Sequence, residues 1–178
     1  MVRTIMSFGA LAGLLVGAPM LGIMIATGGT PPLEYGMLVG YATMLIALST
    51  VFVAIKRQRD LAGGGVIRFW PAFGLGLGIS AVAGLFYVIA WEAALAITQA
   101  DFIGAYTDTL VAQERAKGAG PAAIAQLKAE MEAFKVSYAN PLFRMPMTFA
   151  EIFPVGVLVS LVSAGLLRNP RFLPARRG

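Results

Sequence analysis

Ionisable side chains stand beside two long apolar stretches of this chain, where such groups are rare. Glu92 directly follows Trp91 at the end of one apolar run, and Glu151 lies at the start of another. Arg144 precedes Glu151 by seven residues and can reach either carboxylate. Charged groups at membrane depth are costly, so they are usually paired or functional. We therefore define a candidate polar site with these members: Glu92, Glu151, Arg144, Tyr41 and Tyr87.

The sequence allows two interpretations of this site. In the functional one, both carboxylates lie at the outer ends of membrane-spanning helices and bind a substrate or a proton. Glu92 then faces the interior of the protein and bonds Arg144 or a tyrosine hydroxyl. In the structural one, Glu151 only completes a helix-start capping box with Thr148, and Glu92 only extends to water at the membrane interface.

Several kinds of chemistry are excluded by composition, because the chain contains no cysteine and no histidine. It therefore lacks disulfides, thiolate and imidazole metal ligands, histidine-ligated haem and Ser/His/Asp nucleophile systems. Acid–base chemistry would have to come from carboxylates or tyrosines. We expect no catalytic residues, no metal and no cofactor, and predict that the protein is not an enzyme.

The composition is that of a membrane protein. Of the 178 residues, 58% are hydrophobic and 13% are charged, whereas a soluble domain carries about 25% charged residues. An apolar helix of about 20 residues spans the hydrocarbon core of a bilayer. We predict an all-α polytopic membrane protein, a single domain over residues 1–178, with four transmembrane helices at residues 5–26, 31–55, 71–97 and 148–167.

The segment between the third and fourth spans, residues 98–147, has a different composition, with five basic and five acidic residues. Thr98 and Asp101 form a helix-start pattern. A second helix is predicted from Pro121 to Tyr138, with apolar residues at heptad-like spacing at positions Ile124, Leu127, Met131, Phe134 and Tyr138. We predict a helical hairpin outside the bilayer. The apolar stripe packs either against the preceding helix, along Ile103, Tyr106 and Leu110, or on the membrane surface.

Glycines recur at helical spacing in the apolar runs. Gly9, Gly13 and Gly17 are four residues apart and share one helix face, and Gly74 and Gly78 repeat the spacing in the third span. Small residues at this spacing let two membrane helices approach closely. The sequence predicts helix packing at these positions, either within the bundle or between two copies of the chain.

Basic residues are concentrated at one side of the predicted membrane. With four spans, the N-terminus, the turn after the second span and the tail 168–178 share a side that holds nine basic residues and one acidic residue. The turn contributes Lys56, Arg57 and Arg59. Because cytoplasmic loops are enriched in Lys and Arg, both termini are predicted to be cytoplasmic. The hairpin is then extracytoplasmic, and the basic tail is expected to be poorly ordered.

A series of short motifs extends through nearly the whole chain: Gly40-Tyr41, Ile55-Lys56, Arg59-Asp60, Gly64-Gly65, Tyr87, Trp91-Glu92, Tyr138-Ala139-Asn140-Pro141 and Phe153-Pro154-Val155-Gly156. In this order and spacing they resemble the bacterial four-span membrane proteins grouped as the domain of unknown function 4199 family. The resemblance implies a multi-pass protein of the bacterial cytoplasmic (inner) membrane. It implies no activity.

Three classes of function fit these features. The first is a structural or accessory membrane protein that binds a membrane-protein partner or forms a homo-oligomer, which the glycine face and the apolar stripe favour. The second is a small oligomeric transporter or channel that uses the outer-side carboxylates. The third is an intramembrane enzyme, which the missing catalytic groups disfavour. The lipid bilayer is a partner in each case, and no nucleic acid is expected, because the basic residues lie at membrane boundaries.

Overall fold

All regular structure in the described part of the chain, residues 1–29 and 33–174 of a computed structural model, is helical. The elements are α1 (Val2–Ala26), α2 (Leu33–Ala62), α3 (Phe69–Thr98), α4 (Phe102–Ala116), α5 (Pro121–Tyr138) and α6 (Pro141–Leu167). The predicted all-α fold is confirmed. Residues 31 and 32 of the second predicted span, and Arg176 and Arg177 of the tail, lie outside the described residues.

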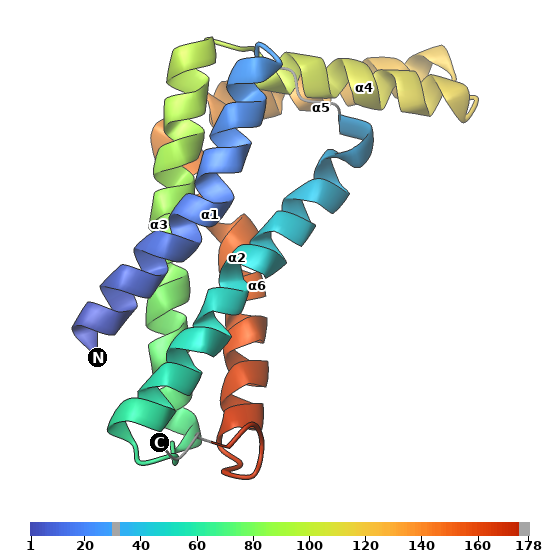
Figure 1. The fold of residues 1–178 in the computed structure, drawn as a ribbon. Helices are drawn as coiled ribbons and strands as arrows, with labels where there is room; N and C mark the ends of the chain where they lie inside the picture. Colours follow the sequence, from blue (N-terminus) through green and yellow to red (C-terminus); the bar gives the residue numbers. More distant parts are fainter. Residues whose placement is uncertain (30–32, 175–178) are drawn as a thin grey trace.

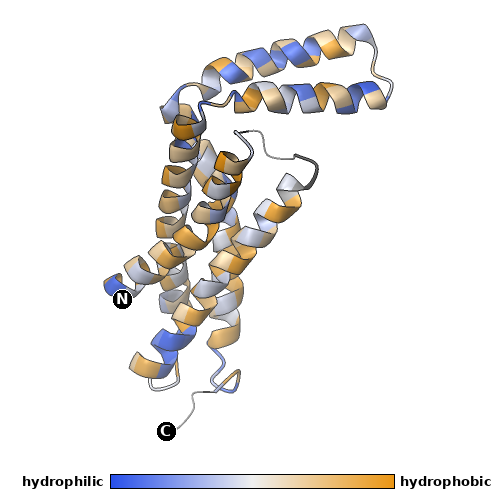
Figure 2. Cartoon of the chain, turned by 45° about the horizontal axis from the view of Figure 1, so that its top comes forward, coloured by the Kyte–Doolittle hydropathy of each residue, from blue (hydrophilic) through white to orange (hydrophobic). Residues whose placement is uncertain are grey.

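Four helices, α1, α2, α3 and α6, are long and apolar enough to cross a membrane. They run alternately in opposite directions, with the α4–α5 hairpin at one end of the bundle and the α2–α3 connection and C-terminal segment at the other (Figure 1). Figure 2 shows apolar residues along the bundle and many hydrophilic residues on the hairpin. Helices suit this environment because they satisfy their own backbone hydrogen bonds in hydrocarbon. The chain is therefore a multi-pass membrane protein.

Helix α3 is the centre of the bundle. Its most extensive contacts are with α1 and α6, and α2 packs against α6 and α1. The core between them is made of fully buried aliphatic side chains, among them Leu48, Val51, Leu75, Ile79 and Ile152. The position of α3 matters for the candidate site because Tyr87 and Glu92 project from it.

The glycine face of α1 contacts α3 within the same chain. Gly9, Gly13 and Gly17 lie opposite three residues of α3 that are also four apart: Val82, Phe86 and Ala90. A methyl group at Gly9 would lie 2.5 Å from the Cβ of Val82, and one at Gly17 would lie 2.9 Å from the Cβ of Ala90. Of the two interpretations of this face, the structure supports close packing inside the bundle.

The two predicted packing glycines of α3 behave differently. A methyl group at Gly78 would lie 2.9 Å from Cδ1 of Ile5 on α1, so Gly78 does pack closely against α1. Gly74 is exposed and has open space around it, so its predicted packing role within the chain is wrong. The spacing of four residues does not fix which glycines face a neighbour, because α3 has neighbours on several sides.

A second close contact, between α3 and α6, was not predicted. Gly76 lies against the side chain of Ser160, and Gly156 lies against that of Ser80. Both serines are fully buried, and each donates its hydroxyl to a carbonyl oxygen in the preceding turn of its own helix. These bonds satisfy the hydroxyls inside the bundle. The two serine oxygens also lie 3.5 Å apart, so Ser80 and Ser160 form a polar contact between α3 and α6.

The predicted basic turn is part of a helix. Lys56, Arg57 and Arg59 continue α2, which ends at Ala62, seven residues beyond the predicted end of the span. No helix-breaking residue occurs before the glycines that follow. The amides of Gly63 and Gly65 donate to the carbonyl of Arg59 and end the helix there. The prediction of a turn at the charged residues was wrong because charge alone does not stop a helix.

The hairpin forms as predicted. Helix α5 has the predicted bounds, and its stripe is buried or half-buried at every position: Ile124, Leu127, Met131, Phe134 and Tyr138. It packs against α4, where Ile103 is buried. The stripe therefore faces protein, which supports packing against the preceding helix rather than a stripe lying on the membrane surface.

Two predicted helix starts are corrected. Thr98 is the last residue of α3, and Asp101 alone caps α4 by accepting a hydrogen bond of 2.9 Å from the Gly104 amide. Thr148 lies inside α6, where its hydroxyl donates to the Arg144 carbonyl. The actual cap of α6 is Asn140, followed by Pro141 at the first helical position. The last helix therefore begins seven residues before the predicted span, and its extra two turns hold Arg144.

Replacing Phe134 with aspartate should destabilise the hairpin. The Phe134 ring contacts the rings of Tyr138 and Phe143, with centroid distances of 5.7 and 6.2 Å. Losing this contact and placing a carboxylate in the stripe should lower stability by on the order of 2 kcal/mol. The matched control is Val136→Asp on the same helix, where the side chain is 70% exposed. Equal melting temperatures for the two variants in detergent would contradict the packing of the stripe.

Candidate functional site

The structure brings Glu92 and Arg144 together. Arg144 donates from Nε to Oε1 of Glu92 at 2.7 Å and from a terminal nitrogen to Oε2 at 2.5 Å. The Glu92 side chain is 20% exposed and the Arg144 side chain is 13% exposed. Two parallel hydrogen bonds between a guanidinium and a carboxylate are the strongest form of this ion pair. The negative charge of Glu92 is therefore balanced by the positive charge of Arg144, at the end of the bundle that carries the hairpin.

Arg144 connects three helices. Besides Glu92 on α3, its other terminal nitrogen donates to the carbonyl of Tyr138, the last residue of α5, at 3.1 Å. The guanidinium also lies 5.5 Å from the centre of the Tyr138 ring. Arg144 itself belongs to α6, because Asn140 starts that helix early. Its planar fork of donors thus fixes the base of the hairpin relative to the bundle.

Aromatic side chains surround this ion pair. The indole nitrogen of Trp91 donates to the hydroxyl of Tyr138 at 2.7 Å, and the Trp91 ring contacts Phe102 of α4 at 5.0 Å. Burial raises the pKa of the Tyr138 hydroxyl to about 12. We call Trp91, Glu92, Phe102, Tyr138 and Arg144 the hairpin joint. The sequence placed Tyr138 in the apolar stripe and in the Tyr138-Ala139-Asn140-Pro141 motif but not in the polar site, although its position just before the Asn140-Pro141 helix start was a usable signal.

A second, more exposed ion pair connects α5 to the start of α4 at the base of the hairpin. Lys135 of α5 donates to Asp101, which also caps α4. The Lys135 ammonium, together with the Gly104 amide, lowers the pKa of the Asp101 carboxyl below its usual value. The same pair raises the pKa of the Lys135 ammonium. Both side chains are about half exposed, so water and salt weaken the interaction.

This pair predicts a modest pH dependence of the hairpin. Because the pKa of Asp101 is lowered, the charged Asp101 carboxylate stabilises the folded hairpin at neutral pH. This contribution to stability is lost as the pH falls through the lowered pKa. The raised pKa of Lys135 means that its stabilisation is lost only in strong base. Lys135→Met should therefore lower the melting temperature between about pH 4 and about pH 10 and have less effect in acid. Lys128→Met on the exposed side of α5 is the control, and an equal loss at all pH values would contradict the prediction.

Glu151 is separated from the ion pair. It lies on an exposed part of α6, and its Oε2 accepts a hydrogen bond of 3.4 Å from the Tyr87 hydroxyl of α3. No basic side chain pairs with Glu151 in the described part of the chain. Tyr41 is half exposed on α2, and within the described residues it forms no hydrogen bond with either carboxylate. The candidate polar site thus divides into a neutralised pair, Glu92–Arg144, and a carboxyl–phenol contact, Glu151–Tyr87.

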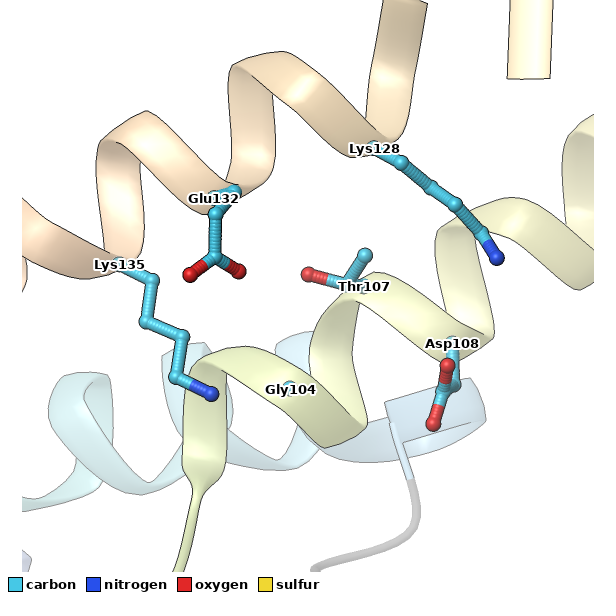
Figure 3. Close-up of a pocket in the computed structure, with 6 residues that line it drawn as sticks. All are labelled: Gly104, Thr107, Asp108, Lys128, Glu132 and Lys135. Carbon is cyan, nitrogen blue, oxygen red and sulfur yellow. The ribbon is translucent and has the colours of Figure 1, made fainter. Parts of the chain in front are cut away.

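A shallow groove between α4 and α5 is open to solvent. Figure 3 shows the side chains of Glu132 and Thr107 pointing toward each other across it, with Lys128 and Asp108 farther along. Its lining residues are Gly104, Thr107, Asp108, Lys128, Glu132 and Lys135. The groove is polar and mixed in charge, so it suits contact with another polar surface better than capture of an apolar molecule.

Arg59 forms a buried polar contact at the opposite end of the bundle. It is fully buried, and it bonds Asp60 at 2.8 Å and the carbonyls of Phe172 and Leu173 at 2.9 and 2.5 Å. The Phe172 ring also packs edge-on against Phe52. The described part of the tail, residues 168–174, therefore folds back onto α2. For residues 168–174 this corrects the expectation of a poorly ordered tail, which overlooked Arg59 as a donor to backbone carbonyls.

The comparisons with known proteins agree with the resemblance found in the sequence. No curated protein and no solved structure matches the chain. A family model described as "Protein of unknown function (DUF4199)" matches residues 7–169, which include α1 from its sixth residue onward, all of α2, α3 and α6, the hairpin joint and Glu151. The chain belongs to this family of proteins of unknown function.

Proposed function

We propose that this protein is an accessory protein of the bacterial cytoplasmic membrane, in which the α4–α5 hairpin is a fixed extracytoplasmic arm that binds a protein partner. The observation that carries the proposal is the hairpin joint. Arg144 ties α3, α5 and α6 together through the Glu92 carboxylate and the Tyr138 carbonyl. A segment held in this way presents its surface in one orientation, which lowers the entropic cost of binding.

The shape and chemistry of the arm support this role. The hairpin extends crosswise from the end of the bundle and reaches beyond α2 (Figure 1). Its apolar stripe is used internally, and most of its outward-facing residues are polar, alanine or glycine. A polar, mixed-charge surface without a deep pocket is typical of a protein contact rather than of a small-molecule site.

The proposed orientation follows from the basic residues. Lys56, Arg57 and Arg68 lie at the end of the bundle opposite the hairpin, as do Arg168 and Arg171 of the C-terminal segment. This excess of basic residues favours the cytoplasm for that end and for both termini. In a Gram-negative cell the hairpin would then lie in the periplasm.

Co-purification from native membranes tests the proposal. The wild-type protein should retain one partner in stoichiometric amount after mild detergent extraction. The variant Asp108→Lys/Lys128→Glu, which alters the groove but not the joint, should lose that partner without a change in melting temperature. Arg57→Glu, an exposed change at the opposite end, is the control. A partner retained equally by all three proteins, or no partner at all, would contradict binding through the hairpin.

A second candidate function, a small oligomeric transporter or channel, is favoured by one observation. Glu151 is an exposed carboxyl within α6 with a tyrosine hydroxyl as its hydrogen-bond partner and without a basic partner among the described side chains. Proton or ion flux in vesicles containing the purified protein tests this candidate. Flux that disappears in Glu151→Gln would support it, and wild-type vesicles as tight as empty ones would reject it.

A further inference from the structure

The depth of Glu151 follows from its contact with α3. Tyr87 precedes Trp91 by four residues, which is one helical turn or about 6 Å along the axis. Trp91 lies in the hairpin joint and within the apolar span Phe69–Thr98, near the end of a span where tryptophan typically marks the edge of the hydrocarbon. Because Tyr87 bonds Glu151, the carboxyl lies about one turn inside the apolar layer.

The surroundings of Glu151 contain phenols rather than cations. Tyr87 on α3 donates a hydrogen bond to it, and Tyr138 on α5 is close enough to interact with it electrostatically. Arg144, seven residues earlier on α6, is already engaged by Glu92. A carboxylate at this depth without a compensating positive charge is strongly disfavoured.

We propose that Glu151 is a proton-binding site that opens sideways to the lipid, with the carboxyl group neutral at physiological pH and supported by the Tyr87 hydroxyl. The exposed position of Glu151 on the bundle surface makes it accessible to molecules dissolved in the bilayer. The proposal is independent of partner binding by the hairpin. It assigns different states to two carboxyls of one protein: Glu92 is charged and paired, and Glu151 is protonated.

A hydrophobic carbodiimide distinguishes these states. A protonated carboxyl transfers its proton to one carbodiimide nitrogen while its oxygen bonds the central carbon. The O-acylisourea that forms rearranges to a stable N-acylurea, so the whole reagent is retained and nothing leaves. A carboxylate locked to a guanidinium lacks the proton that this addition needs, and a reagent that partitions into lipid reaches the bilayer-facing group preferentially.

The experiment treats the protein in liposomes with dicyclohexylcarbodiimide and locates the adduct by peptide mass spectrometry. We expect at least about tenfold more adduct on Glu151 than on Glu92, decreasing as the pH is raised. A water-soluble carbodiimide should modify Glu151 much less. Modification of Glu92 to the same extent, or no adduct on Glu151, would overturn the proposal.

A second measurement does not depend on the reagent. Glutamine resembles a neutral carboxyl in size and hydrogen bonding, so Glu151→Gln should leave the melting temperature unchanged. The matched variant Glu92→Gln should lower it, because it removes the negative charge that Arg144 requires. A loss of stability in Glu151→Gln as large as that in Glu92→Gln would show that Glu151 is a charged structural group.

Discussion

Replacing Arg144 with lysine should destabilise the protein almost as much as replacing it with alanine. Lysine keeps the charge, but it cannot make two parallel bonds to Glu92 and a third to the Tyr138 carbonyl from one rigid group. Breaking one side of a buried ion pair costs about 3–5 kcal/mol, and for this slightly exposed pair we expect about 2–4 kcal/mol. The fluorescence of Trp91, measured in a Trp70→Phe background, reports the unfolding of the joint.

Two comparisons isolate the cause of that loss. Arg115→Lys, on an exposed position of α4, should have no measurable effect. The double variant Glu92→Leu/Arg144→Met should be more stable than the sum of its single losses predicts, because no unpaired charge is left in the joint. Additive losses would show that Glu92 and Arg144 do not stabilise the protein as a pair.

Enlarging Gly13 should prevent close packing of α1 against α3. A methyl group there would overlap Cβ of Phe86, and the backbone of α3 lies directly behind it. We expect Gly13→Leu to abolish correct assembly and Gly13→Ala to cost about 1–3 kcal/mol, as overpacking typically does. Yield of monodisperse protein and melting temperature in detergent are the measurements.

The same helix supplies the control for this prediction. Apart from the neighbouring backbone of its own helix, no atom lies within 4 Å of the position that a methyl group at Gly22 would occupy, so Gly22→Ala should be tolerated. Equal effects at the two glycines would mean that helix propensity, rather than contact with Phe86, determines the outcome. Loss of a dimer with retention of the folded monomer in Gly13→Ala would instead place the glycine face between two copies.

Patterns within one helix were sufficient to predict most of the fold. The apolar runs located the four spans, because only a continuous apolar helix satisfies the bilayer. The stripe from Ile124 to Tyr138 predicted the bounds and buried face of α5, because its spacing and the Gly120-Pro121 and Asn140-Pro141 breaks agree. Gly9, Gly13 and Gly17 predicted a close helix contact but not which helix supplies it.

The sequence was sufficient to predict polar contacts where ionisable residues are scarce, and it was insufficient where several basic residues lie close together in the chain. Glu92 and Arg144 could be paired from the sequence because few ionisable groups lie near the outer ends of the spans. Arg59 looked like one of several surface cations, and only the folded tail shows that it is buried. The helix starts at Thr98 and Thr148 were wrong because capping residues are recognised by local pattern, whereas α3 and α6 extend through them to pack against the hairpin.

The proposed function depends most on the hairpin lying outside the cytoplasm, and the absence of cysteine from the chain makes this directly measurable. Ala116 and Ala62 are exposed, and each is the last residue of its helix, at opposite ends of the molecule. In intact spheroplasts, a membrane-impermeant maleimide should label Ala116→Cys and leave Ala62→Cys unlabelled until the membrane is permeabilised. Labelling of Ala62→Cys in intact spheroplasts, with Ala116→Cys protected, would show that the protein has the opposite orientation in the membrane and would contradict the proposed function.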